Sequence, residues 1–317
     1  MDVVGIDIPV MDFLVHVDKI PETNNGTHLI EYGWQGGGKV ATALVALGRL
    51  GVKTGMIGVV GEDSFGKFCI NDFELHEVDT SNMVIDKGTT TTFCVCISER
   101  QTLGRSIIGK RGTSRALEIG DLNREYITAA RYLHLTNMDP VARQAAVWAR
   151  ESGVKVAFDA DSYHQETADN IELIDVFIAS EFFYRKMFDN DDFEENCRSI
   201  QRKGPSIVVF TFGEKGCLGV GQEGFFNIPA FEIDAVDTTG AGDVYHGAFI
   251  FGLLKGWSTE ETARFASAVS AIKCTRVGGR AGIPDLAAAK RYLIDGEIDY
   301  SGIDKRVDYY RNNILSL

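Results

Sequence analysis

The chain has 317 residues, 44% of them hydrophobic, so it can bury one large core and fits no disordered class; we expect one elaborated α/β domain. Its net charge of −13 argues against a nucleic-acid surface, and the lack of a basic leader or membrane-length apolar run predicts a cytoplasmic protein without a membrane partner. Six cysteines occur without a Cys-x-x-Cys pair, so neither a zinc site nor a disulfide framework is expected.

The first predicted elements are two β-rich segments, residues 13–35 and 89–109, with alternating or threonine-rich patterns and polar turns between them. We expect them to form a small antiparallel sheet that projects from the core. Such a sheet leaves one face exposed and needs a cover, which would be either a ligand with its cleft or a second subunit.

From about residue 115 onward, short apolar runs alternate with amphipathic segments. The runs at residues 132–135, 154–158, 176–179 and 207–211 are typical of buried parallel strands, because they are continuous rather than alternating. This alternation predicts βαβ units. The later pattern Gly219-x-Gly221-x-x-Gly224 matches a dinucleotide-binding fingerprint in letters only, because a β-like run follows it; a hairpin turn is expected instead.

The segment 237–243, which reads Asp-Thr-Thr-Gly-Ala-Gly-Asp, is the most informative part of the chain. Apolar residues after it recur at helical spacing, so a buried helix should begin near Gly240. The free N–H groups of its first turn and the helix dipole would bind phosphate oxygens, and the glycines permit close approach. Asp243 lies in that turn and could accept a hydroxyl proton, although helix capping is an alternative role. His246, one turn later, is expected to pack or to bond locally.

This segment closely resembles the C-terminal signature of the PfkB (ribokinase-like) carbohydrate kinases, and further matches cover nearly the whole chain. Residues 4–12 resemble the family's first strand, 36–51 its N-terminal signature, 211–216 the turn at the nucleotide phosphates and 276–282 the C-terminal loop. The resemblance implies an α/β fold: a three-layer α/β/α sandwich with a mostly parallel central sheet and a small β-sheet lid. Residues 13–35 and 89–112 would form the lid, and 1–12, 36–88 and 113–317 the kinase core.

The resemblance also implies the reaction, transfer of the γ-phosphoryl group of ATP, accompanied by Mg²⁺, to a sugar hydroxyl. Asp243 would be the general base, and Gly240, Ala241 and Gly242 would stabilise the transferring group. Asp12, Gly37, Gly38, Lys39 and Thr42 would bind the sugar. Thr211, Gly213, Gly216, Ser180, Gly242 and Ser267 would bind the nucleotide. Asp237, Thr239 and Gly279 would hold a monovalent cation, K⁺.

Two departures from the family pattern alter these expectations. Many members carry Asn at the position of Thr42, so the sugar contacts are expected to differ. Many also carry Asn-x-x-Glu after the strand that here ends near residue 179, where this chain reads Ser-Glu-Phe-Phe. Glu181 and Asp159, or Asp161 in place of Asp159, are therefore the candidate magnesium ligands, together with water and ATP oxygens. A solvated or capping role for Glu181 is equally open.

A basic run at the end of the predicted lid stands out in this acidic chain; it contains Arg105, Lys110, Arg111 and Arg115. These cations could neutralise an anionic sugar, or they could be the charged, solvated edge that lids need. Several stretches, including residues 273–276 and 278–284, resemble the branch that contains sulfofructose kinase. A sugar sulfonate or sugar phosphate is thus one substrate candidate.

Two other functions are open at this point: a nucleoside kinase on the same scaffold, and a non-catalytic sugar- or nucleotide-binding regulator. A regulator needs no base, so the presence of Asp243 beside both glycines argues against that reading. The resemblance implies a homodimer paired through the lid, with a sugar and ATP as the small-molecule partners; no nucleic acid is expected.

Overall fold

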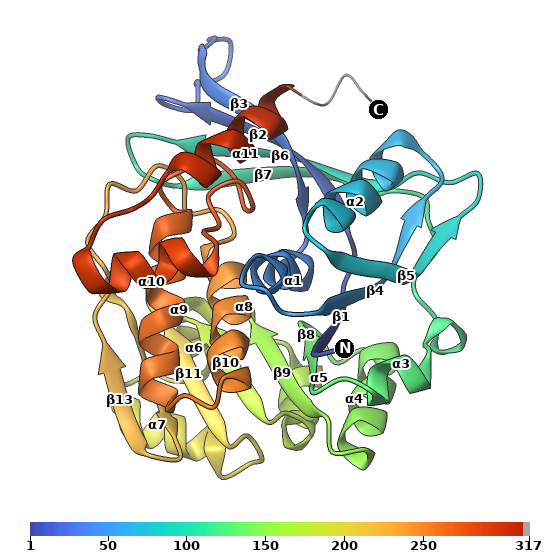
Figure 1. Cartoon of the computed structure of the whole chain (residues 1–317), viewed down its shortest axis with the longest axis vertical. Coiled ribbons are helices and arrows are strands. Elements are labelled where there is room, and N and C mark those ends of the chain that lie inside the picture. Colours follow the sequence, from blue (N-terminus) through green and yellow to red (C-terminus); the bar gives the residue numbers. More distant parts are fainter. Residues whose placement is uncertain (313–317) are drawn as a thin grey trace.

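The computed structural model describes residues 1–312, and the strands of that part form two sheets (Figure 1). The larger sheet contains β1 (Val3–Ile6), β4 (Thr54–Gly61), β5 (Val78–Asp86), β8 (Tyr132–Leu135), β9 (Lys155–Ala160), β10 (Val176–Ser180), β11 (Ile207–Thr211), β12 (Cys217–Gly221) and β13 (Gly224–Ile228). The smaller sheet contains β2 (Val10–Val17), β3 (Leu29–Gly37), β6 (Thr92–Glu99) and β7 (Arg105–Lys110). Their orders are β13-β12-β11-β10-β9-β8-β1-β4-β5 and β3-β2-β6-β7.

The helices connect these strands. They are α1 (Lys39–Arg49), α2 (Ser64–Leu75), α3 (Arg124–Thr128), α4 (Pro140–Glu151), α5 (Gln165–Asp169), α6 (Glu181–Met187), α7 (Phe193–Gln201), α8 (Ala241–Leu254), α9 (Thr259–Lys273), α10 (Leu286–Asp295) and α11 (Ser301–Asn312). Short 3₁₀ turns occur at Ile119–Asp121, Ile171–Leu173 and Gly213–Lys215. Within the described residues, no helix is long and apolar enough to cross a membrane.

The larger sheet is covered on both faces, which makes the predicted three-layer α/β/α sandwich. Successive residues of its strands enter opposite cores: Ile178 and Val209 pack with α1, α8 and α9, whereas Phe177 and Phe210 pack with α4, α6 and α7. Strands buried on both faces need apolar residues at every position, which explains the continuous apolar runs. The strands at Tyr132–Leu135 and Ile207–Thr211 have their predicted bounds, and Gly221 and Gly224 close the predicted β12–β13 hairpin.

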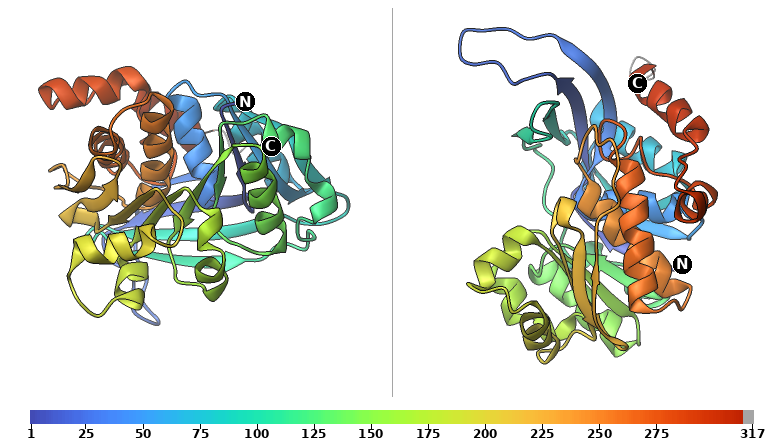
Figure 2. Two further views of the ribbon diagram at one scale, coloured as in Figure 1. Left: turned by 90° about the horizontal axis from the view of Figure 1, so that it is seen from below. Right: turned by 90° about the vertical axis from the view of Figure 1, so that its left-hand side faces the viewer.

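The smaller sheet lies across one end of the sandwich and is mixed rather than purely antiparallel. Strand β2 runs parallel to β6, while β2–β3 and β6–β7 are antiparallel hairpins. The parallel pairing follows from connectivity, because α1, β4, α2 and β5 intervene between the hairpins and bring the chain back in the same direction. The loop between β2 and β3 extends beyond the body in the right-hand view of Figure 2. Asp12 lies in β2, opposite Gln35 and Cys94.

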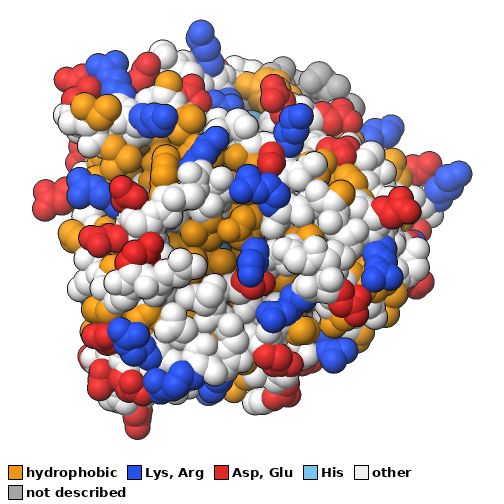
Figure 3. All heavy atoms as spheres, turned by 60° about the horizontal axis from the view of Figure 1, so that its bottom comes forward, with side chains coloured by type: hydrophobic (Ala, Val, Ile, Leu, Met, Phe, Trp, Pro, Cys, Tyr) orange, Lys and Arg blue, Asp and Glu red, His pale blue; other side chains and the backbone are white. Residues whose placement is uncertain are grey.

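Helix α8 is the centre of the core on its side of the sheet, and every residue from Val244 to Gly252 is buried. Two glycines allow this, since a Cβ atom at Gly247 would collide with the carbonyl of Ala43, and one at Gly252 would lie 2.7 Å from Thr262 Oγ1. The helix is thereby fixed against both α1 and α9, which fixes the position of its N-terminal turn. On the face shown in Figure 3, charged side chains of both signs surround a hollowed, hydrophobic area.

Candidate active site

The N-terminus of α8 has the geometry of an anion-binding turn. Gly240 is the N-cap residue and has a left-handed backbone (φ 73°), and a Cβ atom there would lie 2.8 Å from the Cα of Gly279. Glycine is therefore required both by conformation and by space. Ser270 Oγ donates to the carbonyl oxygen of Ala241 (2.7 Å), which anchors the turn to α9. The N–H group of Ala241 donates to Thr238 O (3.1 Å) and that of Val244 to Gly240 O (3.0 Å), so the N–H groups of Gly242 and Asp243 are the ones left for an external acceptor.

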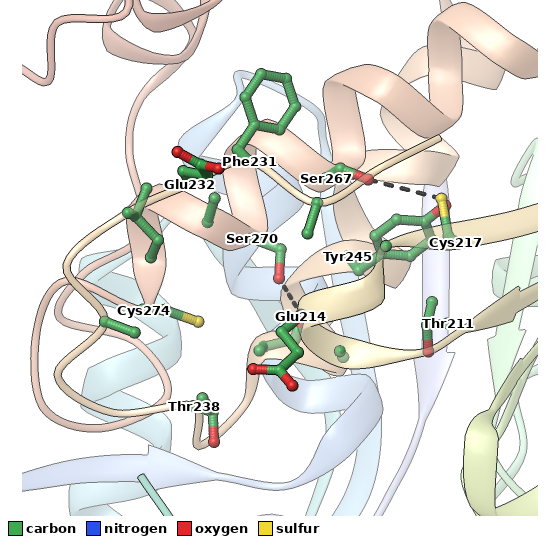
Figure 4. A pocket seen from close by; sticks show the side chains of 18 of the residues that line it. Thr211, Glu214, Cys217, Phe231, Glu232, Thr238, Tyr245, Ser267, Ser270 and Cys274 are labelled. Atoms are coloured by element: carbon green, nitrogen blue, oxygen red, sulfur yellow. Dashed lines mark hydrogen bonds between the residues drawn. The ribbon is translucent and has the colours of Figure 1, made fainter. Parts of the chain in front are cut away.

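A cavity of about 620 Å³ opens beside this turn, between the β12–β13 hairpin and helices α8 and α9 (Figure 4). This volume lies in the range of small-molecule sites. Its lining includes five residues that the sequence assigned to the nucleotide: Thr211, Gly213, Gly216, Gly242 and Ser267. Ser180 does not line it, because this residue caps α6, with its Oγ accepting from Phe183 N (3.2 Å) and donating to Asp161 O (2.6 Å).

Sequence reasoning missed the apolar wall of the cavity. Phe231 and Ile233 come from the irregular segment after β13, and Tyr245 and Ala271 from the facing sides of α8 and α9. Tyr245 donates its hydroxyl hydrogen to Cys217 Sγ (3.2 Å). These residues carry no shared motif, and only the packing of two helices against a hairpin brings them together. The wall offers flat apolar surface of the kind that a planar base contacts.

On the other side of the α8 turn, carboxylates gather around one lysine. Lys39 Nζ donates to Asp161 Oδ2 (2.8 Å), and Asp7 accepts from the backbone N–H groups of Ile8 (2.8 Å) and Ala41 (3.1 Å). Burial raises the pKa of both Asp7 and Asp159 to about 6. Burial and the nearby charge of Asp159 raise the pKa of Asp243 well above its ordinary value, with Lys39 acting in the opposite direction. The cluster thus favours an incoming cation.

Asp7 had no assigned role in the sequence and Asp161 was only an alternative magnesium ligand, although a signal was present for both. Both follow directly on buried parallel strands, β1 and β9, and polar residues at the carboxyl ends of parallel strands commonly face a ligand. His246 is buried and packs, as expected: its Nε2 lies 3.4 Å from Asp159 Oδ1, and its ring stacks on His134 with the centroids 5.6 Å apart. Burial lowers the pKa of His246 to about 3, so the ring is neutral near pH 7.

The triple glycine before α1 makes room for three charged side chains. A Cβ atom at Gly36 would collide with the guanidinium of Arg280, and one at Gly37 with the carboxylate of Asp12. At Gly38, which has a φ of 97°, a Cβ atom would lie 2.9 Å from Asp7 Oδ2. The predicted sugar-binding residues Asp12, Gly37, Gly38 and Lys39 therefore lie along one turn between the lid and the core.

The carboxylate of Asp12 is expected to make stability depend on pH. Burial raises its pKa to about 6 from 3.8, so the stability that its protonated form provides is complete below the unfolded value and is lost as the pH rises through about 6. Asp12→Asn should therefore be about 1–2 kcal/mol more stable than the unaltered protein near pH 7.5, and equally stable near pH 4. Urea unfolding at both pH values measures this; a difference that does not change with pH would contradict it.

Thr42 is buried, and its hydroxyl is already engaged by the protein. Its Oγ1 accepts from Nε of Arg280 at 3.4 Å, while Nη2 of the same guanidinium donates to Gly37 O at 2.9 Å. Arg280 is fully buried and forms an ion pair with Asp72. The threonine that replaces the family's usual asparagine thus supports the arginine that holds the glycine turn.

The residues assigned to a monovalent cation lie together, but a lysine lies among them. The side chain of Asp237 accepts from the N–H groups of Thr239 (2.9 Å) and Gly278 (2.7 Å), and Gly279 packs against Gly240. The main-chain oxygen of Asp237 accepts from Lys273 Nζ at 2.8 Å.

Glu181, the first residue of α6, lies near two cations, with its Oε1 3.6 Å from Arg185 Nε and 3.7 Å from Lys215 Nζ. Asp159 lies instead beside His246 in the carboxylate cluster. Among residues 1–312, no three His, Cys, Asp or Glu side chains are grouped to hold a metal ion.

The structure divides the basic run of the lid. Arg105 begins β7 and lies close enough to Asp161 and Asp243 to lower the pKa of each, although burial raises both. Lys110 ends the same strand, about 17 Å away at the usual rise per residue. Arg115 binds Asp121 (2.6 Å), and Arg111 is exposed. The β6–β7 turn contacts the anion-binding turn, because Thr238 Oγ1 donates to Leu103 O (3.5 Å).

A doubly covered, mostly parallel sheet, an anion-binding helix start and a partly buried carboxylate beside it are the features that a phosphotransferase needs. The sequence pattern described as "pfkB family carbohydrate kinase" matches residues 1–286, so the chain belongs to this family, and the predicted sugar-kinase class and ribokinase-like fold are confirmed. The chain is 27% identical to a ribokinase of Lactococcus lactis subsp. lactis (91% of this chain, 96% of the relative) and 26% identical to a nucleoside kinase of Methanothermobacter thermautotrophicus (92% and 95%). The ribokinase of Arabidopsis thaliana, solved with ribose and ATP, superimposes with a TM-score of 0.77 at 22% identity (92% and 98% covered).

Proposed function

We propose that this protein transfers the γ-phosphoryl group of ATP, bound with Mg²⁺, to a hydroxyl of an anionic sugar, with Asp243 as the general base. The observation that carries the proposal is the position of the α8 turn. Gly242 lines the cavity, and the carboxylate of the next residue, Asp243, lies close enough to Asp159, Lys39 and Asp7 for their charges to shift its pKa. A phosphate in the cavity and a hydroxyl at Asp243 would therefore meet at Gly240–Gly242.

The electrostatics of the turn suit such a transfer. The N–H groups at the start of α8 would bind the equatorial oxygens of the transferring group, whose negative charge is spread over them in the transition state. Asp243 would accept the sugar proton. Its raised pKa makes it a stronger base than an exposed aspartate, and Lys39 limits that increase. When bound with ATP, Mg²⁺ would offset phosphate charge, and Asp159 and water would be candidate oxygen ligands for it.

A screen for ADP release against ketoses, sugar phosphates, sugar sulfonates such as sulfofructose, sugar acids and nucleosides tests the function. Turnover with a sugar is the expected result. Turnover confined to nucleosides would establish the nucleoside kinase instead, and folded protein that turns over none of these compounds would support a binding regulator.

Arg105 is the lid cation that supports an anionic substrate, because its charge acts on the carboxylates of Asp243 and Asp161 and lowers the pKa of each. Arg105→Ala should raise the KM for an anionic sugar about tenfold and the KM for a neutral analogue much less. Lys110→Ala and Arg111→Ala change cations at the far end of β7 and serve as matched controls. If all three variants keep the KM of the unaltered enzyme for the anionic sugar, the basic run is a solvated edge.

The lid also supports a homodimer. Its exposed side chains include Leu29, Ile30, Tyr32, Ile107 and Ile108, which leave apolar surface on two hairpins. We place the dimeric enzyme in the cytoplasm, where ATP is available. Light scattering that finds only a monomer at working concentrations would exclude the dimer.

A further inference from the structure

Lys273 is the last residue of α9, and its side chain is fully buried. An ammonium group is rarely buried without compensation, because removing it from water is costly. Two features compensate here. The group lies at the C-terminal end of a helix, where the dipole favours a cation, and its Nζ donates to the main-chain oxygen of Asp237 at 2.8 Å.

This contact joins two loops. The N–H groups of Val236 and Asp237 donate to Cys274 O (2.8 and 3.1 Å), and the Asp237 carboxylate accepts from Thr239 and Gly278. Burial alone would raise the pKa of Asp237, but the Lys273 charge and these N–H groups hold it below its ordinary value. Every oxygen atom of Asp237 therefore has a hydrogen-bond donor. The charged donor is the ammonium of Lys273, a side chain of this protein and not a bound ion.

We propose that the Lys273 ammonium takes the place of the monovalent cation expected at Asp237, Thr239 and Gly279, so that this enzyme needs no K⁺. A potassium ion at the same carbonyl oxygen would lie next to a buried positive charge, and the repulsion would oppose its binding. The ammonium fixes Asp237 only three residues before Gly240. It therefore holds the anion-binding turn in shape and adds positive charge behind it, which are the two things that a bound cation would supply.

The first test uses the unaltered protein. Its unfolding temperature should be the same in KCl and in tetramethylammonium chloride at about 0.15 M, a concentration at which general screening is matched. This measurement needs no substrate, so it stands even if the proposed function fails. With an active substrate in hand, kcat should change by less than about twofold between the two salts, and a K⁺-specific activation of about tenfold or more would overturn the proposal.

The second test creates a cation requirement. Lys273→Ser removes the ammonium and leaves space, so its turnover and unfolding temperature should fall in tetramethylammonium and recover in K⁺. Lys273→Met fills the space with an apolar chain and should not recover. Lys290→Met, which removes an exposed lysine of α10, is the matched control and should behave like the unaltered enzyme. Recovery of neither property by K⁺ in a folded Lys273→Ser protein would contradict the proposal, and if that variant does not fold, the salt response of the unaltered protein decides.

Discussion

Replacing Asp243 with asparagine is expected to lower kcat by about 10²–10⁴-fold and to leave the KM for ATP nearly unchanged. The asparagine amide fills the same space at the third position of α8 but cannot accept the sugar proton. Because Gly242 lines the cavity proposed for the nucleotide and Asp243 is not among its lining residues, ATP binding should not depend on the carboxylate. Steady-state kinetics with varied ATP measures both quantities.

Asp189→Asn is the control for this variant, since it removes an exposed carboxylate far along the chain from the α8 turn. It should retain full turnover. Near-normal kcat in Asp243→Asn would remove Asp243 as the base, whereas a large rise in the KM for ATP would show that the carboxylate acts in nucleotide binding.

The second large effect is expected for Asp72→Ala, which should destabilise the fold by about 3–5 kcal/mol, because it leaves the Arg280 guanidinium buried without its counter-ion. Arg280 is fully buried and stacks on Phe73 at 5.1 Å, so water cannot replace the lost partner. The loss should also raise the KM for the sugar, since Arg280 binds Gly37 O and Thr42. Urea unfolding and sugar kinetics measure the two effects.

The double variant Asp72→Leu with Arg280→Met separates charge from packing. It removes both charges and should recover much of the stability but not the sugar affinity, since an apolar pair of similar size is often as stable as a buried ion pair. A double variant less stable than Asp72→Ala would show that packing, and not the unpaired charge, is the main loss.

The features that the sequence predicted well are those that depend on patterns over a few neighbouring residues. The β8 and β11 strands are continuous apolar runs, and Gly240 followed by helical spacing locates the start of α8 within one residue. These features are local, because periodicity and conformational preference act over a few residues. The family resemblance added the layers of the fold.

What the sequence could not predict depends on contacts between distant positions. The expected sugar contact of Thr42 stays a prediction, and the sequence gives no sign that its hydroxyl also accepts from Arg280, 238 residues away. The parallel pairing of β2 with β6 and the Lys273–Asp237 contact are likewise set only when the core packs. Arg105 and Lys110 are both basic residues of the lid, and the sequence does not distinguish them. The course of β7 brings the charge of Arg105, and not that of Lys110, close enough to lower the pKa of Asp243.

The last helix of the described chain also contacts the residues that support the glycine turn, although it lies outside the family pattern, which ends at residue 286. On α11, which lies against β3 in Figure 1, Tyr310 donates to Asp72 (2.6 Å) and Arg311 pairs with Glu31 of β3 (2.8 Å). Asp72 in turn holds Arg280 against the glycine turn. Two relatives with identical signature motifs could therefore prefer different sugars because their C-terminal helices differ, and an alignment restricted to the shared region would not reveal why.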